Sequence, residues 1–141
     1  MSEFPLSGGW VRMSAIDAVA MAAVVQYLFF GVLVARARAR HGVKAPAVSG
    51  SEPFERIYRV QTNTLELLVA LLPTLYAAGR YWPPLLVAGA GAVYLAGRLV
   101  YWRAYVGDPS RRSLGFLLSA GPVFALAVAT LAAALSGKGP A

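Results

Sequence analysis

Three polar side chains, Arg59, Asn63 and Glu66, stand at the start of an apolar segment that is long enough to cross a bilayer. On a helix they share one face, because they are separated by four and then three residues. Ionisable groups cost about 3 kcal/mol each to insert at membrane depth, so they indicate a functional site. A guanidinium binds anions, whereas carboxylate and amide oxygens accept hydrogen bonds from an ammonium group. We therefore expect this face to hold a small ligand that carries both charges.

A second polar face is predicted further along the chain, where Tyr94, Arg98, Tyr101 and Tyr105 follow one another at intervals of four, three and four residues. Tyrosines supply hydroxyl groups and ring faces, although we expect Tyr94 to pack or to anchor at the headgroups. Arg112, in the following turn, is expected to close the site. Several arginines against a single intramembrane carboxylate leave positive charge uncompensated. This excess favours an anion such as glutathione, which has two carboxylates and one ammonium group.

The composition indicates an integral membrane protein. The chain is 58% hydrophobic and 13% charged with a mean hydropathy of +0.60, whereas soluble domains carry about 25% charged residues. The net charge of +7 does not indicate nucleic-acid binding, because the basic residues gather between the apolar runs, as cytoplasmic loop charges do. Cysteine is absent, which excludes disulfides, thiolate metal sites and a cysteine nucleophile. We expect no metal site.

We expect residues 1–141 to form one all-α domain, a bundle of four transmembrane helices. Four apolar stretches are long enough to cross about 30 Å of hydrocarbon: residues 13–35, 57–78, 84–106 and 114–135. The first is too long for a signal-peptide core and is followed by arginines, so we interpret it as a retained anchor. Loops one and three carry most of the lysines and arginines, which predicts that both are cytoplasmic and that both termini lie on the other side.

Two motifs resemble those of the membrane-associated proteins in eicosanoid and glutathione metabolism, the MAPEG family, which includes microsomal glutathione transferases, leukotriene C synthase and the lipoxygenase-activating protein. The first motif is GSEPFERIYRVQTNT at residues 50–64. Its departures from the family pattern are Ile57, Val60 and Thr64. The second is GRLVYWRAY at residues 97–105, followed by an Asp-Pro turn and Arg112. With the four-helix layout, the resemblance spans nearly the whole chain.

The resemblance implies a homotrimer that binds glutathione between neighbouring subunits, with Arg112 stabilising the glutathione thiolate. The glutathione-binding residues that it implies are Arg38, Arg59, Gln61, Asn63, Glu66, Arg98, Tyr101 and Tyr105. The register is loose at the end of the first span, so Arg36 is an alternative to Arg38 for a contact with a glutathione carboxylate. Leu67 stands where leukotriene C synthase has a tyrosine, which argues against identity with that enzyme.

The expected activity follows from the chemistry of a thiol beside an arginine. The fixed positive charge lowers the thiol pKa and so increases the fraction of nucleophilic thiolate. We expect a glutathione transferase that acts on lipophilic electrophiles from the membrane lipid, with glutathione peroxidase activity on lipid hydroperoxides as a further expectation. The alternative is a non-catalytic lipid- or glutathione-binding scaffold, like the lipoxygenase-activating protein. A transporter has less support, because no inverted repeat is evident.

The composition also bears on where the protein works. Its richness in alanine and arginine is typical of a high-GC bacterium, which predicts an inner-membrane location. There the native task would be detoxification and not leukotriene synthesis.

Overall fold

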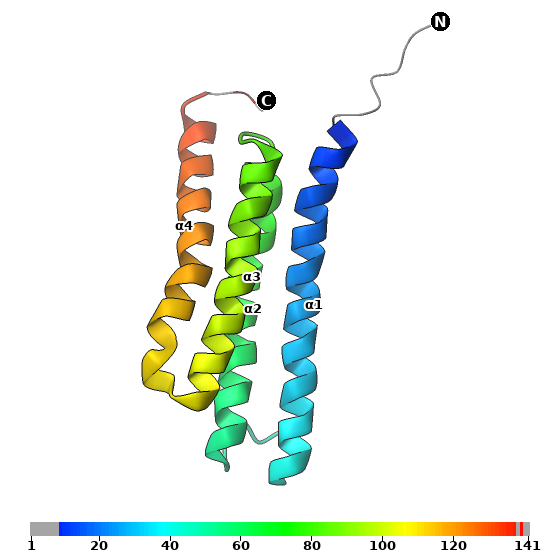
Figure 1. Ribbon diagram of the computed structural model, residues 1–141, viewed down its shortest axis with the longest axis vertical. Coiled ribbons are helices and arrows are strands. Elements are labelled where there is room, and N and C mark those ends of the chain that lie inside the picture. The colour runs from blue at the N-terminus through cyan, green and yellow to red at the C-terminus, as the bar shows by residue number, and fades with distance from the viewer. Residues whose placement is uncertain (1–8, 138, 140–141) are drawn as a thin grey trace, which may run out of the picture.

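The chain folds into an up-and-down bundle of long helices, which confirms the predicted fold class (Figure 1). The computed structural model describes residues 9–137 and residue 139, with side chains from residue 15 onward. The helices are α1 (Gly9–His41), α2 (Glu52–Ala78), α3 (Pro84–Gly107) and α4 (Ser113–Leu135), with a short 3-10 helix, η1 (Pro109–Arg112), before α4. No strand occurs in these residues.

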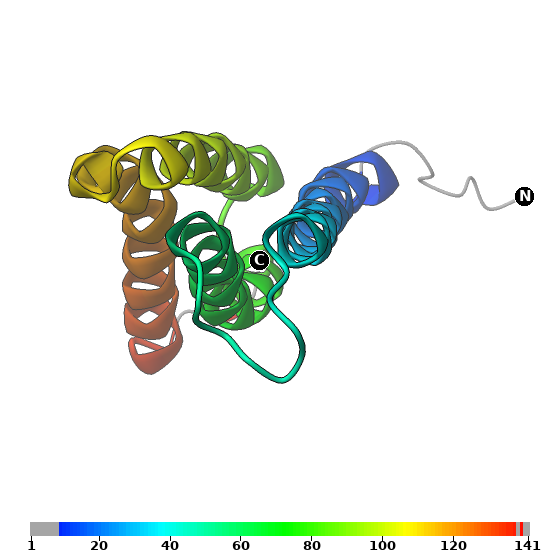
Figure 2. The same ribbon diagram turned by 90° about the horizontal axis from the view of Figure 1, so that it is seen from below.

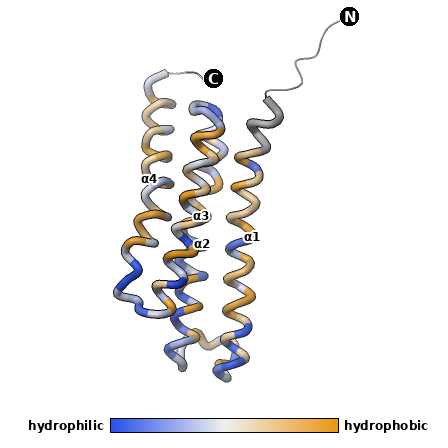
Figure 3. The backbone as a smooth tube through the Cα atoms, viewed as in Figure 1, coloured by the Kyte–Doolittle hydropathy of each residue, from blue (hydrophilic) through white to orange (hydrophobic). Residues whose placement is uncertain are grey.

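Three helical segments are long and apolar enough to cross a membrane, namely Ala15–His41, Pro84–Gly107 and Pro109–Leu135. α2 is less apolar because polar side chains occupy its first half, which Figure 3 shows as the hydrophilic part of that helix. These side chains include the predicted ligand-binding face. The second transmembrane span therefore stays a prediction.

α1 and α4 lie on opposite sides of the central helices (Figure 2). α1 packs against α2 and α3, and α4 packs against α3 and α2. All four helices contribute to the main core, whose largest buried members include Ile16, Leu71, Leu75, Val87, Tyr94 and Leu126. Tyr94 is fully buried in this core, in agreement with its predicted packing role. Large apolar side chains such as Leu85, Phe124 and Leu135 remain exposed on the outside, as expected for surfaces that lipid or another protein chain covers.

The α1–α2 and α3–α4 connections lie at the same end of the bundle, and the α2–α3 turn lies at the other (Figure 1). Arg38 organises the first connection: its Nη1 donates to the carbonyl oxygen of Ala47 at 2.7 Å and to that of Val43 at 3.3 Å. Its guanidinium also lies 4.7 Å from the centre of the Phe54 ring. Arg38 therefore ties the end of α1 to the start of α2.

Two glycines allow α3 and α4 to approach closely. A Cβ on Gly97 would lie 2.7 Å from the carbonyl carbon of Leu118, and a Cβ on Gly115 would lie 2.8 Å from the Cβ of Tyr101 and still closer to its backbone. Both separations are shorter than nonbonded atoms tolerate, so a side chain at either position would push the helices apart. The contact at Gly115 fixes the first turn of α4 beside Tyr101.

Candidate functional site

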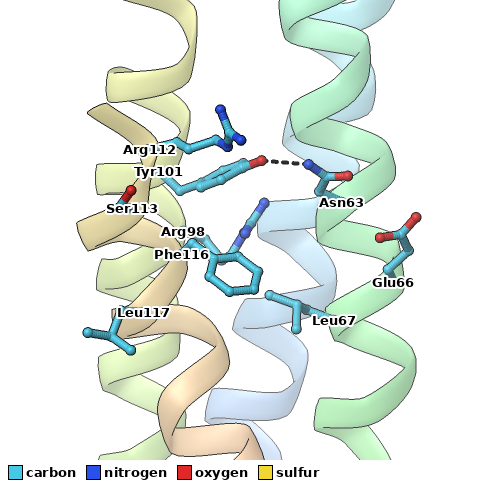
Figure 4. Close-up of a pocket in the computed structure, with 9 residues that line it drawn as sticks. All are labelled: Asn63, Glu66, Leu67, Arg98, Tyr101, Arg112, Ser113, Phe116 and Leu117. Atoms are coloured by element: carbon cyan, nitrogen blue, oxygen red, sulfur yellow. Dashed lines mark hydrogen bonds between the residues drawn. The ribbon is translucent and has the colours of Figure 1, made fainter. Parts of the chain in front are cut away.

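A groove of about 710 Å³ opens between α2, α3 and the first turns of α4 (Figure 4). We call it the central groove. The residues that line it are Asn63, Glu66, Leu67, Arg98, Tyr101, Arg112, Ser113, Phe116 and Leu117. Most of the polar lining residues come from α2 and α3, and Phe116 and Leu117 of α4 form an apolar wall. The groove can therefore accept a polar ligand and an apolar one side by side.

A hydrogen bond between α2 and α3 crosses the polar part of the groove. Asn63 Nδ2 donates to Tyr101 Oη at 2.5 Å (Figure 4). Tyr101 is only 2% exposed, so its ring is held in place by packing. The predicted faces of the second and third helices therefore meet at this pair. The Asn63 carbonyl oxygen remains available to accept a hydrogen bond from a ligand.

Arg98 forms the floor of the groove and is fully buried. Its Nε and Nη2 donate to Thr64 Oγ1 at 3.2 and 2.7 Å, and Nη2 also reaches the carbonyl oxygen of Val60 at 3.4 Å. The guanidinium lies 4.0 Å from the centre of the Tyr101 ring. Among the described residues, no carboxylate pairs with it and its Nη1 has no hydrogen-bond partner. Arg98 thus brings an uncompensated positive charge beneath Tyr101.

Arg112 enters the groove from the end of η1 and extends beside Tyr101 (Figure 4). It is exposed, and its Nη1 donates to the carbonyl oxygen of Pro109 at 3.0 Å. No acidic side chain in the described part of the chain pairs with Arg112. Its guanidinium lies 6.0 Å from the centre of the Tyr105 ring. A cationic group without an acidic partner among the described residues is therefore directed into the groove.

Asp108 stabilises the turn that carries Arg112. Its Oδ1 accepts hydrogen bonds from the Ser110 hydroxyl at 2.7 Å and from the Ser110 backbone N–H at 3.0 Å. These two bonds, with a smaller contribution from the positive charge of Arg111, lower the pKa of Asp108 below its ordinary value. The ionised carboxylate is thus the form that holds the turn.

The central groove brings together five of the nine predicted site residues: Asn63, Glu66, Arg98, Tyr101 and Arg112. Glu66 lies at its edge, where its carboxylate points away from Tyr101 (Figure 4). Within one chain, Glu66 therefore marks the boundary of the groove and leaves its carboxylate free for a partner outside it.

The other four predicted residues lie elsewhere. Arg59 and Tyr105 line a smaller cavity of about 300 Å³ near the start of α2. Gln61 turns towards α1, where its Nε2 is 3.0 Å from the position that a Cβ on Gly31 would occupy. Arg38 binds loop carbonyl groups, as described above. The ligand roles of all nine residues remain predictions.

Five residues that shape the site are not among the nine predicted from the sequence, and Leu67 of α2 is one of them. Phe116 and Leu117 form the apolar wall with Ser113 beside them, and Thr64 is the main hydrogen-bond acceptor for Arg98. Phe116 follows Arg112 by four residues, so helical spacing offers a signal for this wall. Thr64 stands out in the sequence only as a departure from the family pattern.

Comparisons with known proteins agree with this architecture. The sequence model of the MAPEG family matches residues 16–132. The uncharacterized protein sll1147 of Synechocystis sp. is 45% identical over 96 residues, which cover 68% of this chain and 70% of that protein. Microsomal glutathione S-transferase 2 of Homo sapiens is 37% identical over 120 residues, with 85% of this chain and 80% of that protein covered. Leukotriene C4 synthase of Cavia porcellus is 38% identical over 121 residues, with coverage of 85% and 81%.

The family match contains every residue of the central groove, and it contains all of α2, α3 and η1. It also contains most of α1 and α4. The shared region is therefore nearly the whole helical bundle and not one isolated motif. On this match and these identities, the chain belongs to the MAPEG family.

Proposed function

We propose that this protein is an integral membrane glutathione transferase in which Arg112 stabilises the glutathione thiolate. The observation that carries the proposal is the exposed Arg112 guanidinium, which has no acidic partner among the described residues and projects into an open groove. The name of one relative, microsomal glutathione S-transferase 2, supports the choice of glutathione as the ligand.

The proposed reaction needs no nucleophile from the protein. The glutathione thiol gives its proton to water, and the resulting thiolate is stabilised by the positive charge of Arg112. The sulfur then attacks an electrophilic carbon, where a C–S bond forms as the bond to the leaving group breaks. The absence of cysteine from the chain is compatible with this scheme.

The apolar wall of the central groove suggests how the second substrate arrives. Leu67, Phe116 and Leu117 line the same groove as Arg112, and Phe116 and Leu117 are exposed. A lipophilic electrophile dissolved in the bilayer would meet this wall first and so approach the thiolate from the membrane side. We propose the same route for a lipid hydroperoxide. The thiolate attacks the terminal oxygen, an S–O bond forms as the O–O bond breaks, and the lipid alkoxide takes a proton from water to leave as the alcohol. The resulting glutathione sulfenic acid then reacts with a second glutathione to give glutathione disulfide and water.

We further propose that the working form is a homotrimer with glutathione between subunits. Arg38 stands at the end of α1 and Arg112 at the start of α4, and these helices lie on opposite sides of α2 (Figure 2). If both arginines contact one glutathione molecule, they must come from different subunits. The same arrangement would explain why Gln61 faces away from the central groove of its own chain.

The ultraviolet absorbance of the thiolate tests the catalytic proposal. Glutathione added to the purified protein should produce this absorbance, and the protein should conjugate a generic aryl halide. Arg112→Ala should lose the thiolate signal and nearly all turnover while it keeps most of its glutathione affinity. Arg103→Ala, which removes an exposed arginine of α3 from outside the groove, is the matched control and should behave like the wild type.

Two outcomes would change the assignment. If Arg112→Ala loses affinity and turnover to the same extent, Arg112 binds the ligand and does not activate it. If the wild type binds glutathione but gives neither thiolate absorbance nor conjugation, the non-catalytic scaffold becomes the better explanation.

A further inference from the structure

A separate basic cavity of about 510 Å³ lies at the end of α1, away from the central groove. We call it the α1 cavity. Its lining residues are Leu33, Arg36, Ala37, Ala39, Arg40, His41 and Ile57. None of them lines the central groove or the smaller cavity near Arg59. The proposed transferase reaction does not use it.

The positive side chains of the α1 cavity have no partner in the described part of the chain. Arg36, Arg40 and His41 are exposed, and their side chains form no hydrogen bond or ion pair with any residue that the structure describes. The nearest carboxylates along the chain have other roles: Glu52 pairs with Arg56, and Glu55 accepts a hydrogen bond from the Gly50 N–H at 2.9 Å. The cavity therefore presents positive charge that an anion can neutralise.

The cavity is also divided into an apolar part and a charged part along α1. Leu33 and Ala37 of α1, with Ile57 of α2, supply apolar surface. Arg40 and His41 stand in the last turn of α1. The apolar span of α1 ends at His41, so the cations stand at the end of the segment that can cross the membrane. Figure 3 shows this change from hydrophobic to hydrophilic at the lower end of α1. The apolar part thus faces the acyl-chain depth and the cations face the headgroup depth.

We propose that the α1 cavity binds an anionic phospholipid. Arg36 and Arg40 would contact the headgroup phosphate, His41 would add a hydrogen bond, and one acyl chain would lie along Leu33, Ala37 and Ile57. A soluble anion would satisfy the charged part alone and would leave the apolar part unused. The combination of both parts in one cavity is the reason to choose a lipid.

The test uses the full-length protein in detergent, with bound phosphatidylglycerol and phosphatidylcholine counted by native mass spectrometry. The wild type should retain phosphatidylglycerol in preference to phosphatidylcholine. Each arginine at an anionic lipid surface strengthens binding by about fivefold, so Arg40→Ala should bind about fivefold more weakly and Arg36→Ala/Arg40→Ala about 25-fold more weakly. Arg36→Lys/Arg40→Lys keeps the charge and should retain most of the binding.

The matched control is Arg103→Ala/Arg111→Ala, which removes two exposed arginines from α3 and η1 outside the cavity. It should leave phosphatidylglycerol binding within about twofold of wild type, because this variant loses only positive charge outside the cavity, and salt screens the effect of such charge. An equal loss in the control would show that the lipid is attracted by the net charge of the protein, and the cavity would have no specific role.

Two further measurements separate the lipid from soluble ligands. Soluble glycerol phosphate should not displace phosphatidylglycerol at matched concentration; if it does so as well as the lipid does, the cavity is a phosphate site and the lipid proposal is wrong. Glutathione affinity should be the same in Arg40→Ala and in the wild type. If it falls together with lipid binding, the cavity belongs to the glutathione site and the lipid proposal is again wrong.

Discussion

Gly115 of α4 lies directly against the backbone of Tyr101 of α3, so closely that a Cβ at position 115 would overlap the backbone nitrogen and Cα of Tyr101. Tyr101 in turn accepts the hydrogen bond from Asn63 at 2.5 Å. The close approach of two helices therefore sets the position of a groove residue, and it also sets the start of α4 next to Arg112. The packing of α3 against α4 and the geometry of the central groove both depend on the contact between Gly115 and Tyr101.

Gly115→Ala should consequently damage both stability and ligand binding. The added methyl group would overpack the α3–α4 contact at a cost of about 1–3 kcal/mol, and it would displace Tyr101 relative to Arg112. We expect a lower thermal midpoint in detergent and weaker glutathione binding. Gly121→Ala is the control on the same helix, because a Cβ at position 121 would meet no atom within 4 Å; it should leave both quantities near wild type. Unchanged properties in Gly115→Ala would show that α4 can move without cost.

Thr64→Val tests the buried arginine. Thr64 Oγ1 accepts two hydrogen bonds from Arg98, and valine has nearly the same shape without the acceptor. The loss should lower the free energy of unfolding by about 1–3 kcal/mol, because it leaves a buried cation with fewer partners. Thr62→Val, whose hydroxyl bonds only to the Tyr58 carbonyl oxygen within α2, is the matched control and should change stability by less than about 0.5 kcal/mol. If both variants lower the free energy of unfolding equally, the hydrogen bonds to Thr64 do not stabilise the buried Arg98 side chain.

The α3–α4 turn should loosen in acid because of Asp108. Its pKa is lowered in the folded state, chiefly by the hydrogen bonds from Ser110, so the ionised form favours the folded turn. The ionised Asp108 carboxylate makes its full contribution to the stability of the turn above the ordinary aspartate pKa of 3.8. This contribution is lost as the pH falls through the lower pKa that Asp108 has in the folded state. Proteolysis within the turn should therefore rise below that pH in the wild type. In Asp108→Asn it should be faster at neutral pH and should show no such step; a step of equal size in the variant would point to another group.

Mixing two inactive variants tests the shared site. If glutathione lies between subunits, Arg38→Ala and Arg112→Ala chains assembled together should form some sites that contain both intact arginines. Random assembly of a cyclic trimer from equal amounts gives about a quarter of the sites in this form. Activity should reach about that fraction of wild type, although each variant alone is inactive. If the mixture stays inactive while mixed assemblies are seen by mass spectrometry, both arginines act in the same subunit or not at one ligand.

The helices could be predicted closely because their cause is local. A long apolar run in a membrane must satisfy its own backbone hydrogen bonds, which leaves the helix as the stable form. The expected segments 84–106 and 114–135 differ by one residue at a boundary from α3 and α4. The main differences are at the arginine-rich end of α1, which stays helical to His41 before Gly42 adopts a positive φ of 65°, and at the start of α2, which begins at Glu52. Hydropathy does not mark these polar turns, although arginine and glutamate are good helix formers.

The site could be predicted only in part. Spacing along one helix identifies a face, and Asn63 and Glu66, with Arg98 and Tyr101, do line one groove as that spacing predicts. Spacing does not reveal which neighbour a face meets. Arg38 is expected beside a ligand, yet in this chain its side chain binds the carbonyl groups of Val43 and Ala47. Arg98 is expected at a ligand too, and its side chain is fully buried beneath Tyr101.

By itself, the sequence determined the number of long helices, their approximate ends and the residue types available for binding an anion, because each of these depends on residues that are close together in the chain. The tertiary structure decided which of those residues share a groove. That choice depends on how each helix is rotated against its neighbours, and the rotation is set by contacts between distant positions, such as Gly115 against Tyr101 and Arg98 against Thr64. Only the packed bundle brings Arg112, Asn63 and the apolar wall at Phe116 to one place.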